Sequence, residues 1–238
     1  MNIALIIAGG SGKRTGQDIP KQFLNVLDKP IVVYTLEAFQ RHPEIDAIAV
    51  VCLDGWQEIL WAYARQFGIA KLKWVAFGGA SGQESIRNGL YVLSGNVTDG
   101  DIVVLHDGIR PMVSERIVTS CIGVCKAHGN GISARKVTEQ VFRTEDEACA
   151  KDYIPRESLR ILQTPQAYRY GVLRDAYEKG FAQGIGIGSS AYANTLLADL
   201  GETLYFAEGS TKNIKITTRE DIEIFKAMLQ TQQSDWLK

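Results

Sequence analysis

The strongest constraint on the fold is an alternation between short apolar runs and longer amphipathic segments in the first half of the chain. Four runs are almost continuously apolar, namely IALIIA (3–8), AIAVVC (47–52), LKWVAF (72–77) and DIVVLH (101–106). Three segments carry apolar residues at helical spacing, namely residues 31–42, 57–68 and 81–93. Continuous apolar runs are typical of parallel strands that are covered on both faces. The alternation therefore predicts an α/β fold with a doubly wound, mostly parallel sheet.

The pattern changes after about residue 130. Residues 131–165 are polar, partly alternating and poor in helix signals. This segment predicts an extended β-arm that leaves the main sheet, with residues 133–160 as its protruding part. The chain contains no repeat and no low-complexity linker, so we expect residues 1–238 to form one domain that carries this arm.

Local signals place several further elements. Ser81 and Glu84 have the S-x-x-E spacing of a capping box, which predicts that a helix begins there. Another helix is expected over residues 171–184. The segment NIKITT (213–218) predicts a last strand, and Thr218 followed by Asp221 predicts the start of a final helix.

Composition argues against several classes of partner. The formal net charge is −1, so no overall positive field attracts nucleic acid or an anionic membrane. No apolar run approaches the length that spans a bilayer, and the N-terminal run is typical of a strand and not of a signal peptide. The four cysteines, Cys52, Cys121, Cys125 and Cys149, lack metal-binding spacing. We therefore expect reduced thiols in or near the core, no nucleic acid or membrane partner, and a cytoplasmic location.

A glycine-rich loop with nearby cations follows the first predicted strand. Its residues are Gly9, Gly10, Gly12 and Gly16, and the cations are Lys13, Arg14 and Lys21. Glycines let successive N–H groups turn towards an anion. The order of residues matches neither a Walker loop nor a G-x-G-x-x-G turn. The loop alone is compatible with either a polyphosphate site or a solvated basic turn.

A resemblance to a known family covers nearly the whole chain in five ordered blocks. These are AGGSGKR…PKQF (8–23), FGGASGQESIRNGL (77–90), HDGIRP (106–111), IPRESLRILQTPQAY (154–168) and EGSTKNIKITTREDI (208–222). They resemble the 2-C-methyl-D-erythritol 4-phosphate and D-ribitol 5-phosphate cytidylyltransferases. The resemblance implies a Rossmann-like nucleotidyltransferase fold whose β-arm is used in dimerisation. It implies transfer of CMP from CTP to a polyol phosphate, giving a CDP-polyol and pyrophosphate.

The resemblance also assigns roles to individual residues. Arg14, Lys21 and Lys215 match the family's catalytic cations. The implied nucleotide-binding residues are Ala8, Gly9, Gly10, Gly12, Gly78, Gly79, Ser85 and Gly108. The implied substrate-binding residues are Asp107, Arg110, Thr138 and Arg156, of which Thr138 and Arg156 reach the substrate across a homodimer made through the arm at residues 133–160. Asp107 is also the implied ligand of Mg²⁺ or another divalent cation.

Three places depart from the family's usual pattern. Gly82 stands where an arginine is usual, and Val137 stands where an aspartate is usual. The segment GIGSSAYANTLL (186–197) lacks the usual Thr-Asp pair, although Ser189 and Ser190 have the chemistry to cap a helix there.

The sequence leaves several alternatives open. The blocks do not decide between the two polyol phosphates, which belong to isoprenoid and to teichoic acid or capsule biosynthesis. The competing hypotheses are a Rossmann oxidoreductase, a GT-A-like glycosyltransferase and a catalytically idle partner subunit. The missing G-x-G-x-x-G motif disfavours the first, and HDGIR is a poor substitute for the metal motif of the second.

Overall fold

A single mixed sheet forms the centre of the molecule. The computed structural model describes residues 1–10, 19–146, 148–188 and 192–232. Within these residues, seven strands pair in the order β11-β7-β10-β6-β1-β4-β5. They are β1 (Asn2–Ala8), β4 (Ala47–Cys52), β5 (Leu72–Phe77), β6 (Ile102–Asp107), β7 (Asn130–Lys136), β10 (Arg160–Arg169) and β11 (Phe206–Glu208). Strand β10 is antiparallel to both neighbours, and the other pairings are parallel. The predicted mostly parallel α/β sheet is confirmed, including the four apolar strands of the first half.

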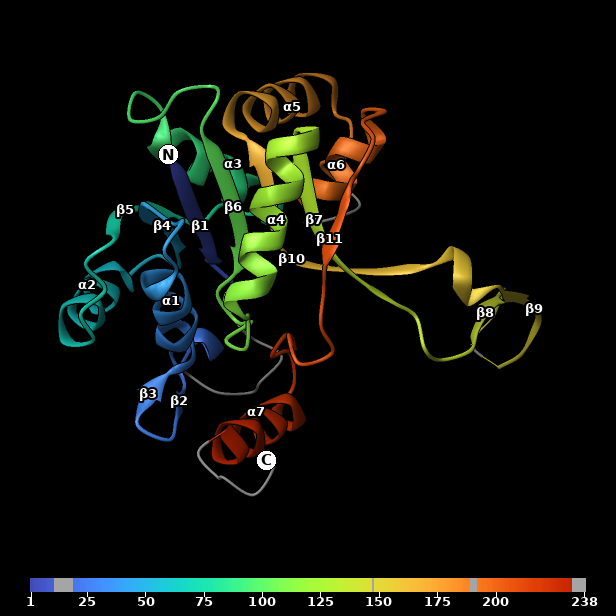
Figure 1. The fold of residues 1–238 in the computed structure, drawn as a ribbon, viewed down its shortest axis with the longest axis horizontal. Helices are drawn as coiled ribbons and strands as arrows, with labels where there is room; N and C mark the ends of the chain where they lie inside the picture. The colour runs from blue at the N-terminus through green and yellow to red at the C-terminus, as the bar shows by residue number, and fades with distance from the viewer. Residues whose placement is uncertain (11–18, 147, 189–191, 233–238) are drawn as a thin grey trace.

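Helices cover both faces of the sheet (Figure 1). They are α1 (Ile31–Arg41), α2 (Gln57–Gln66), α3 (Gly82–Leu93), α4 (Glu115–His128), α5 (Tyr170–Gln183), α6 (Ala193–Asp199) and α7 (Arg219–Gln232). Alternate residues of β1 point to opposite faces. Ala4 and Ile6 pack with α1, α2 and α4, whereas Ile3 and Leu5 pack with α3, α5 and α6. Because five of its six apolar side chains are buried and that of Ile7 is partly buried, the first strand forms the centre of a two-faced core.

The sheet takes in both ends of the segment that the sequence predicts as an arm. Strands β7 and β10 pair with each other over these residues. The hairpin of β8 (Val141–Thr144) and β9 (Ala150–Ile154) stands away from the sheet in Figure 1, together with the chain on either side of it, including the 3-10 helix η3 (Arg156–Ser158). Buried positions of β7 and β10 carry polar side chains such as Ser133, Gln163 and Gln166. Hydrophobic periodicity does not predict such strands, because polar side chains occupy some of their buried positions. Hydrogen bonds satisfy these buried polar groups.

The prediction of a strand at residues 213–218 is wrong. These residues form a loop, and the last strand of the sheet is β11, which pairs with β7. The loop is held by a hydrogen bond from Ile216 N to Ile109 O of 2.9 Å. Ile216 is fully buried against Phe225 of α7. The alternation of apolar and polar residues in NIKITT therefore comes from a loop that is anchored by the buried Ile216, and not from a hydrogen-bonded strand.

Side-chain caps begin two helices where the sequence predicts them. Ser81 Oγ accepts a hydrogen bond from Glu84 N at 3.1 Å. The Glu84 carboxylate accepts from Ala80 N and not from Ser81 N, so the capping box is only half formed. At α7 the cap is reciprocal: Thr218 Oγ1 accepts from Asp221 N, and Asp221 Oδ2 accepts from Thr218 N.

The thiols lie largely in the core. Cys52, Cys121 and Cys125 are free and buried, and Cys149 is free and exposed on the hairpin. Burial raises the pKa of the Cys52 and Cys121 thiols to about 12, so both are protonated and unreactive. In the described part of the chain, no helix combines the length and apolarity needed to cross a bilayer.

Candidate active site

One cavity lies where the carboxyl ends of the central strands meet. Its volume is about 530 Å³, within the range of ligand-binding clefts. Its lining includes Ala8, Gly9 and Gly10 after β1, Gly79 and Ser85 around the start of α3, Asp107 at the end of β6, and Lys21 and Lys215. The structure thus brings together predicted site residues that are up to about two hundred positions apart in the chain. Arg14 and Gly12 lie outside the described residues.

Glycine is required where the two loops of this cavity approach each other. A Cβ on Gly9 would lie 3.2 Å from Gly78 Cα, so the backbones of the two loops are in direct contact. A Cβ on Gly79 would lie 2.9 Å from Ser85 N and closer still to Glu84 Cβ. The chain therefore lines the cavity with backbone at Gly9 and Gly79, so that no side chain of these two residues stands between the loops and a ligand.

Gly79→Ala is expected to raise the KM for the nucleotide that the sequence resemblance implies, CTP, about tenfold or more. The loop must shift to accommodate the methyl group, and even a small misplacement of contacts is costly. Steady-state kinetics at varied CTP checks this prediction. Gly123→Ala is the matched control, since a Cβ at Gly123 in α4 meets nothing within 4 Å. Equal KM values for the two variants would contradict a tight loop at Gly79.

Gln22 is a site residue that sequence reasoning missed. It is 1% exposed, and its Nε2 donates to Ala8 O at 2.8 Å and to Gly10 O at 2.9 Å. One buried amide therefore holds the carbonyl groups at the start of the glycine loop. Gln22 lies within the block PKQF, but only the fold shows that the amide turns back onto β1.

Ser85 lies at the loop of Gly78 and Gly79, and its hydroxyl is largely used in hydrogen bonds there. Its Oγ accepts from Gly79 N at 3.0 Å and donates to Ser81 O at 2.9 Å. Because a hydroxyl has one proton to donate, Ser85 keeps only acceptor capacity for a ligand. Gly108, another predicted nucleotide contact, packs beneath the glycine loop, where a Cβ would lie 3.1 Å from Ala8 Cβ.

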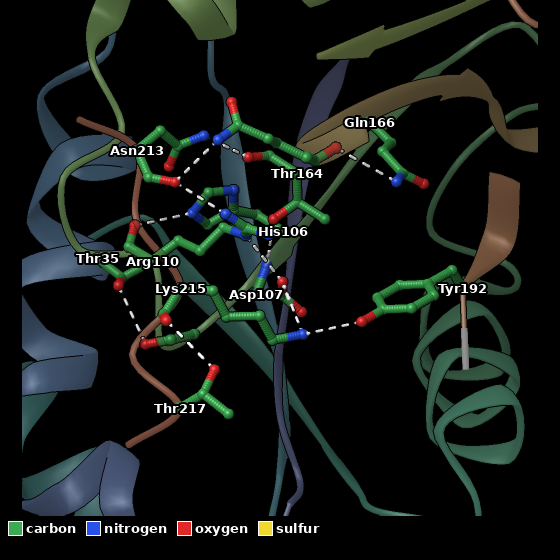
Figure 2. A network of polar contacts seen from close by, with 12 residues as sticks. Thr35, His106, Asp107, Arg110, Thr164, Gln166, Tyr192, Asn213, Lys215 and Thr217 are labelled. Atoms are coloured by element: carbon green, nitrogen blue, oxygen red, sulfur yellow. Dashed lines mark hydrogen bonds and ion pairs between the residues drawn. The ribbon is translucent and has the colours of Figure 1, made fainter. Parts of the chain in front are cut away.

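Asp107 is the centre of an ion-pair cluster (Figure 2). Its Oδ2 lies 3.0 Å from Arg110 Nε and 3.2 Å from Lys215 Nζ. Burial alone would raise the pKa of the Asp107 carboxyl, but Lys215 and Arg110 outweigh burial and hold that pKa below its usual range. The carboxylate is therefore ionised, and two cations against one carboxylate leave the cluster positively charged.

Lys21 supplies a further cation to the same cavity. It begins the short 3-10 helix η2 (Lys21–Phe23) and is only 8% exposed. The positive charge of Lys21 interacts electrostatically with the Asp221 carboxyl at the cap of α7. Burial would raise the pKa of that carboxyl, but N–H groups of Thr218 and Thr217, together with Lys21, lower it. The cap of α7 is thus electrostatically linked to the cavity.

Arg110 is held inside the protein. Its Nη1 donates to Asn213 O at 2.8 Å, in addition to the ion pair with Asp107. Arg110 lines a second cavity of about 260 Å³, together with Asp107, Leu162, Gln163, Thr164, Gln166, Tyr192 and Asn194. Asn213 is fully buried and donates to Thr164 O at 2.7 Å. These contacts fix the loop that carries Lys215.

His106 is a structural residue. Its side chain is fully buried and its Nε2 donates to Arg110 O at 3.1 Å. Burial lowers the pKa of His106 to about 4, so the ring is neutral. The buried, neutral imidazole therefore supports the Asp107–Arg110 turn.

Thr138 and Arg156 lie apart from the main cavity. Arg156 Nη1 donates to Thr138 O at 2.9 Å, and both residues line a separate cavity of about 510 Å³ at the base of the hairpin. The structure therefore brings these two predicted substrate residues to each other, but not to Lys21 or Lys215 of the same chain.

Comparison with known proteins decides the family. The family model described as "IspD: 2-C-methyl-D-erythritol 4-phosphate cytidylyltransferase" matches residues 2–231. The chain belongs to this family. A ribitol-5-phosphate cytidylyltransferase of Lacticaseibacillus paracasei is 50% identical, over 98% of this chain and 100% of the relative. A 2-C-methyl-D-erythritol 4-phosphate cytidylyltransferase of Clostridium novyi is 32% identical, over 96% of each chain.

Solved structures agree with this assignment. The crystal structure of 4-diphosphocytidyl-2C-methyl-D-erythritol synthase from Anaerococcus prevotii superposes with a TM-score of 0.82 at 27% identity, covering 96% of both chains. Family membership confirms the resemblance found in the sequence and makes the chain a cytidylyltransferase. It also disfavours the oxidoreductase and glycosyltransferase alternatives.

Proposed function

We propose that this cytidylyltransferase transfers CMP from CTP to D-ribitol 5-phosphate, with release of pyrophosphate. The observation that carries the reaction class is the single cavity that gathers Lys21, Asp107 and Lys215 against glycine backbone. The choice of ribitol 5-phosphate rests on the relative of that name at 50% identity over its whole length. Relatives named for 2-C-methyl-D-erythritol 4-phosphate are 32–34% identical.

The reaction requires the protein to position two anionic substrates and to stabilise the negative charge that develops between them. An oxygen of the polyol phosphate attacks the α-phosphorus of CTP, and a new P–O bond forms. The bond between the α-phosphorus and the oxygen that bridges to the β-phosphorus breaks, and its electron pair leaves with pyrophosphate. The attacking oxygen is already ionised, so no general base is required. The site must hold two anions together and stabilise the charge that develops between them.

The cations of the cavity suit these tasks. Lys215, paired with Asp107 at the end of β6, faces the junction of the two cavities, where it would contact both the α-phosphate and the polyol phosphate. Lys21, nearly buried after the glycine loop, would contact the triphosphate as a compact point charge. Arg14, from the same loop, would hold the β- and γ-phosphates. Gly9 and Gly10 would offer backbone N–H groups to the nucleotide, whereas Gly78 N and Gly79 N already donate to Cys52 O and Ser85 Oγ.

Asp107 is the residue that would hold a divalent cation. Mg²⁺ prefers oxygen ligands, keeps several waters, and is usually bound by one or two carboxylates with substrate phosphates. Both ion pairs of Asp107 use Oδ2, and the described residues contain no cluster of three or more potential metal ligands. This donor set fits a cation that arrives with the triphosphate. When bound, Mg²⁺ would neutralise part of the triphosphate charge.

The arm suggests how a second subunit would complete the site. Thr138 and Arg156 are exposed at the base of the hairpin, away from Lys21 and Lys215 of their own chain. We propose a homodimer in which residues 133–160 of each subunit reach the partner, so that Arg156 binds the polyol phosphate bidentately.

Arg156→Ala is then expected to raise the KM for the polyol phosphate about tenfold to a hundredfold, the scale of one charge-assisted hydrogen bond, with little change in the KM for CTP. Kinetics with each substrate varied in turn checks this. Arg143→Ala, an exposed arginine of β8 that does not line the same cavity, is the control. An unaltered KM for the polyol phosphate would remove Arg156 from the substrate site.

The free thiols support a proposal for the cellular location. Four cysteines are free, and Cys149 is exposed to solvent. Free thiols persist in a reducing compartment. We therefore propose that the enzyme works in the cytoplasm.

A pyrophosphate-release screen tests the proposed function. Purified enzyme is incubated with CTP and each of ribitol 5-phosphate, 2-C-methyl-D-erythritol 4-phosphate and other pentitol or tetritol phosphates, and then with the other nucleoside triphosphates. We expect the highest kcat/KM for CTP with ribitol 5-phosphate. Preference for 2-C-methyl-D-erythritol 4-phosphate would contradict the proposed substrate. Absence of pyrophosphate release with every polyol phosphate would indicate a catalytically idle member of the family.

A further inference from the structure

Tyr192 contacts Lys215 at the edge of the active-site cavity. Its hydroxyl oxygen lies 3.4 Å from Lys215 Nζ, and the same Nζ lies 5.1 Å from the centre of the ring. On its other side, Nζ is 3.2 Å from Asp107 Oδ2. Figure 2 shows the lysine side chain extended between these two groups. The ammonium group is therefore held by a carboxylate and by an aromatic side chain.

The main chain at Tyr192 is well anchored, although 42% of the residue is exposed. Its carbonyl oxygen accepts from Gln83 Nε2 at 3.1 Å and from Thr195 Oγ1 at 2.8 Å. Gln83 is 1% exposed, and its Oε1 accepts from Tyr177 OH at 2.6 Å. A buried amide of α3 and a buried tyrosine of α5 thus fix the point from which the Tyr192 ring projects.

Tyr192 also stands at the junction of the two cavities. It lines both the cavity of about 530 Å³ and the cavity of about 260 Å³. Among the described residues, Asp107 is the other residue that lines both. Lys215, which lines the larger cavity, lies between these two residues. Tyr192 is thus placed to control where the ammonium group sits at the junction.

We propose that Tyr192 is a positioning residue for Lys215, an inference that rests on the proposed function. A lysine has a long, flexible stem and a strongly hydrated charge. The ring restricts the stem and keeps the ammonium group at the junction, where a triphosphate and a polyol phosphate would meet. Without the ring, attraction to Asp107 would draw the ammonium group towards the carboxylate and away from the phosphates.

A double-mutant cycle tests this role, using CTP and the polyol phosphate that the wild-type enzyme uses best. Tyr192→Ala is expected to lower kcat about tenfold or more, because a misplaced catalytic group costs rate, and to change the KM for CTP less than about threefold. Tyr192→Phe should recover most of the loss, since the ring contact remains. In a Lys215→Ala background, Tyr192→Ala should have no further effect on kcat.

Equal losses from Tyr192→Ala in the two backgrounds would overturn the proposal, because Tyr192 would then act independently of Lys215. The proposal would also be overturned if Tyr192→Phe lowered kcat as much as Tyr192→Ala does. Tyr91→Ala, at an exposed tyrosine of α3 that lines neither cavity, is the matched control and should retain activity. If the wild type prefers a polyol phosphate other than ribitol 5-phosphate, the proposed substrate is wrong, while the cycle still decides the role of Tyr192.

Discussion

Lys215→Ala is expected to lower kcat about a hundredfold or more while the protein stays folded. The ammonium group lines the cavity and is positioned by Asp107 and Tyr192. Removing one preorganised charge-stabilising donor typically costs a factor of about 10² to 10³ in kcat. The side chain is partly exposed, so loss of its ion pair should change the free energy of unfolding by about 1 kcal/mol or less.

Steady-state kinetics and thermal unfolding of the same preparation separate these two effects. Lys212→Ala is the matched control, because Lys212 is an exposed lysine three positions earlier in the same loop and does not line the cavity. A Lys215→Ala enzyme with activity within a few-fold of the wild type would make Lys215 an ordinary surface charge. The assigned role of the ion-pair cluster would then be wrong.

Lys21→Ala is expected to have an effect of similar size on kcat. Lys21 is nearly buried at the cavity, where a cation acts in a drier environment and its charge is screened less than at the surface. Lys21→Arg should not restore full activity, because a planar guanidinium does not replace a compact ammonium group in a tight space.

Kinetics with CTP, combined with a melting curve for each variant, measures this effect. Because Lys21 also lowers the pKa of Asp221, Lys21→Ala should weaken the cap of α7 slightly, and the melting curve detects that. Lys73→Ala, at an exposed position of β5, is the control. Normal turnover by a folded Lys21→Ala enzyme would exclude Lys21 from contact with the triphosphate.

The parallel half of the fold could be predicted from the sequence, because its strands are apolar on both faces. Strands β1, β4, β5 and β6 lie where the four apolar runs predicted them. Strands β7 and β10 could not be found in this way. Both Gln163 and Gln166 are buried in β10; Gln163 donates to the distant Ser210 O, and Gln166 accepts from the Tyr168 hydroxyl within the strand. Apolar patterning does not reveal these polar contacts.

Sequence motifs predict the glycine loop, Asp107 and Lys215 as site residues. They do not predict the contacts that hold such residues in place. Gln22 and Tyr192 act through contacts with residues 14 and 23 positions away, Ala8 and Lys215. Contacts of this kind depend on how loops return to the sheet, so they become visible only in the folded chain. Arg14 lies outside the described residues, and its role stays a prediction.

The most direct test of the central claim is a crystal structure of the enzyme with CTP, followed by soaking with ribitol 5-phosphate. The account predicts the triphosphate in the cavity at the carboxyl ends of the strands, with phosphate oxygens within hydrogen-bond distance of Lys21 Nζ and Lys215 Nζ and the cytosine ring against Gly78 and Gly79. The polyol phosphate should lie beside it, on the side of Arg110. A triphosphate bound elsewhere, with neither lysine in contact with it, would contradict the account.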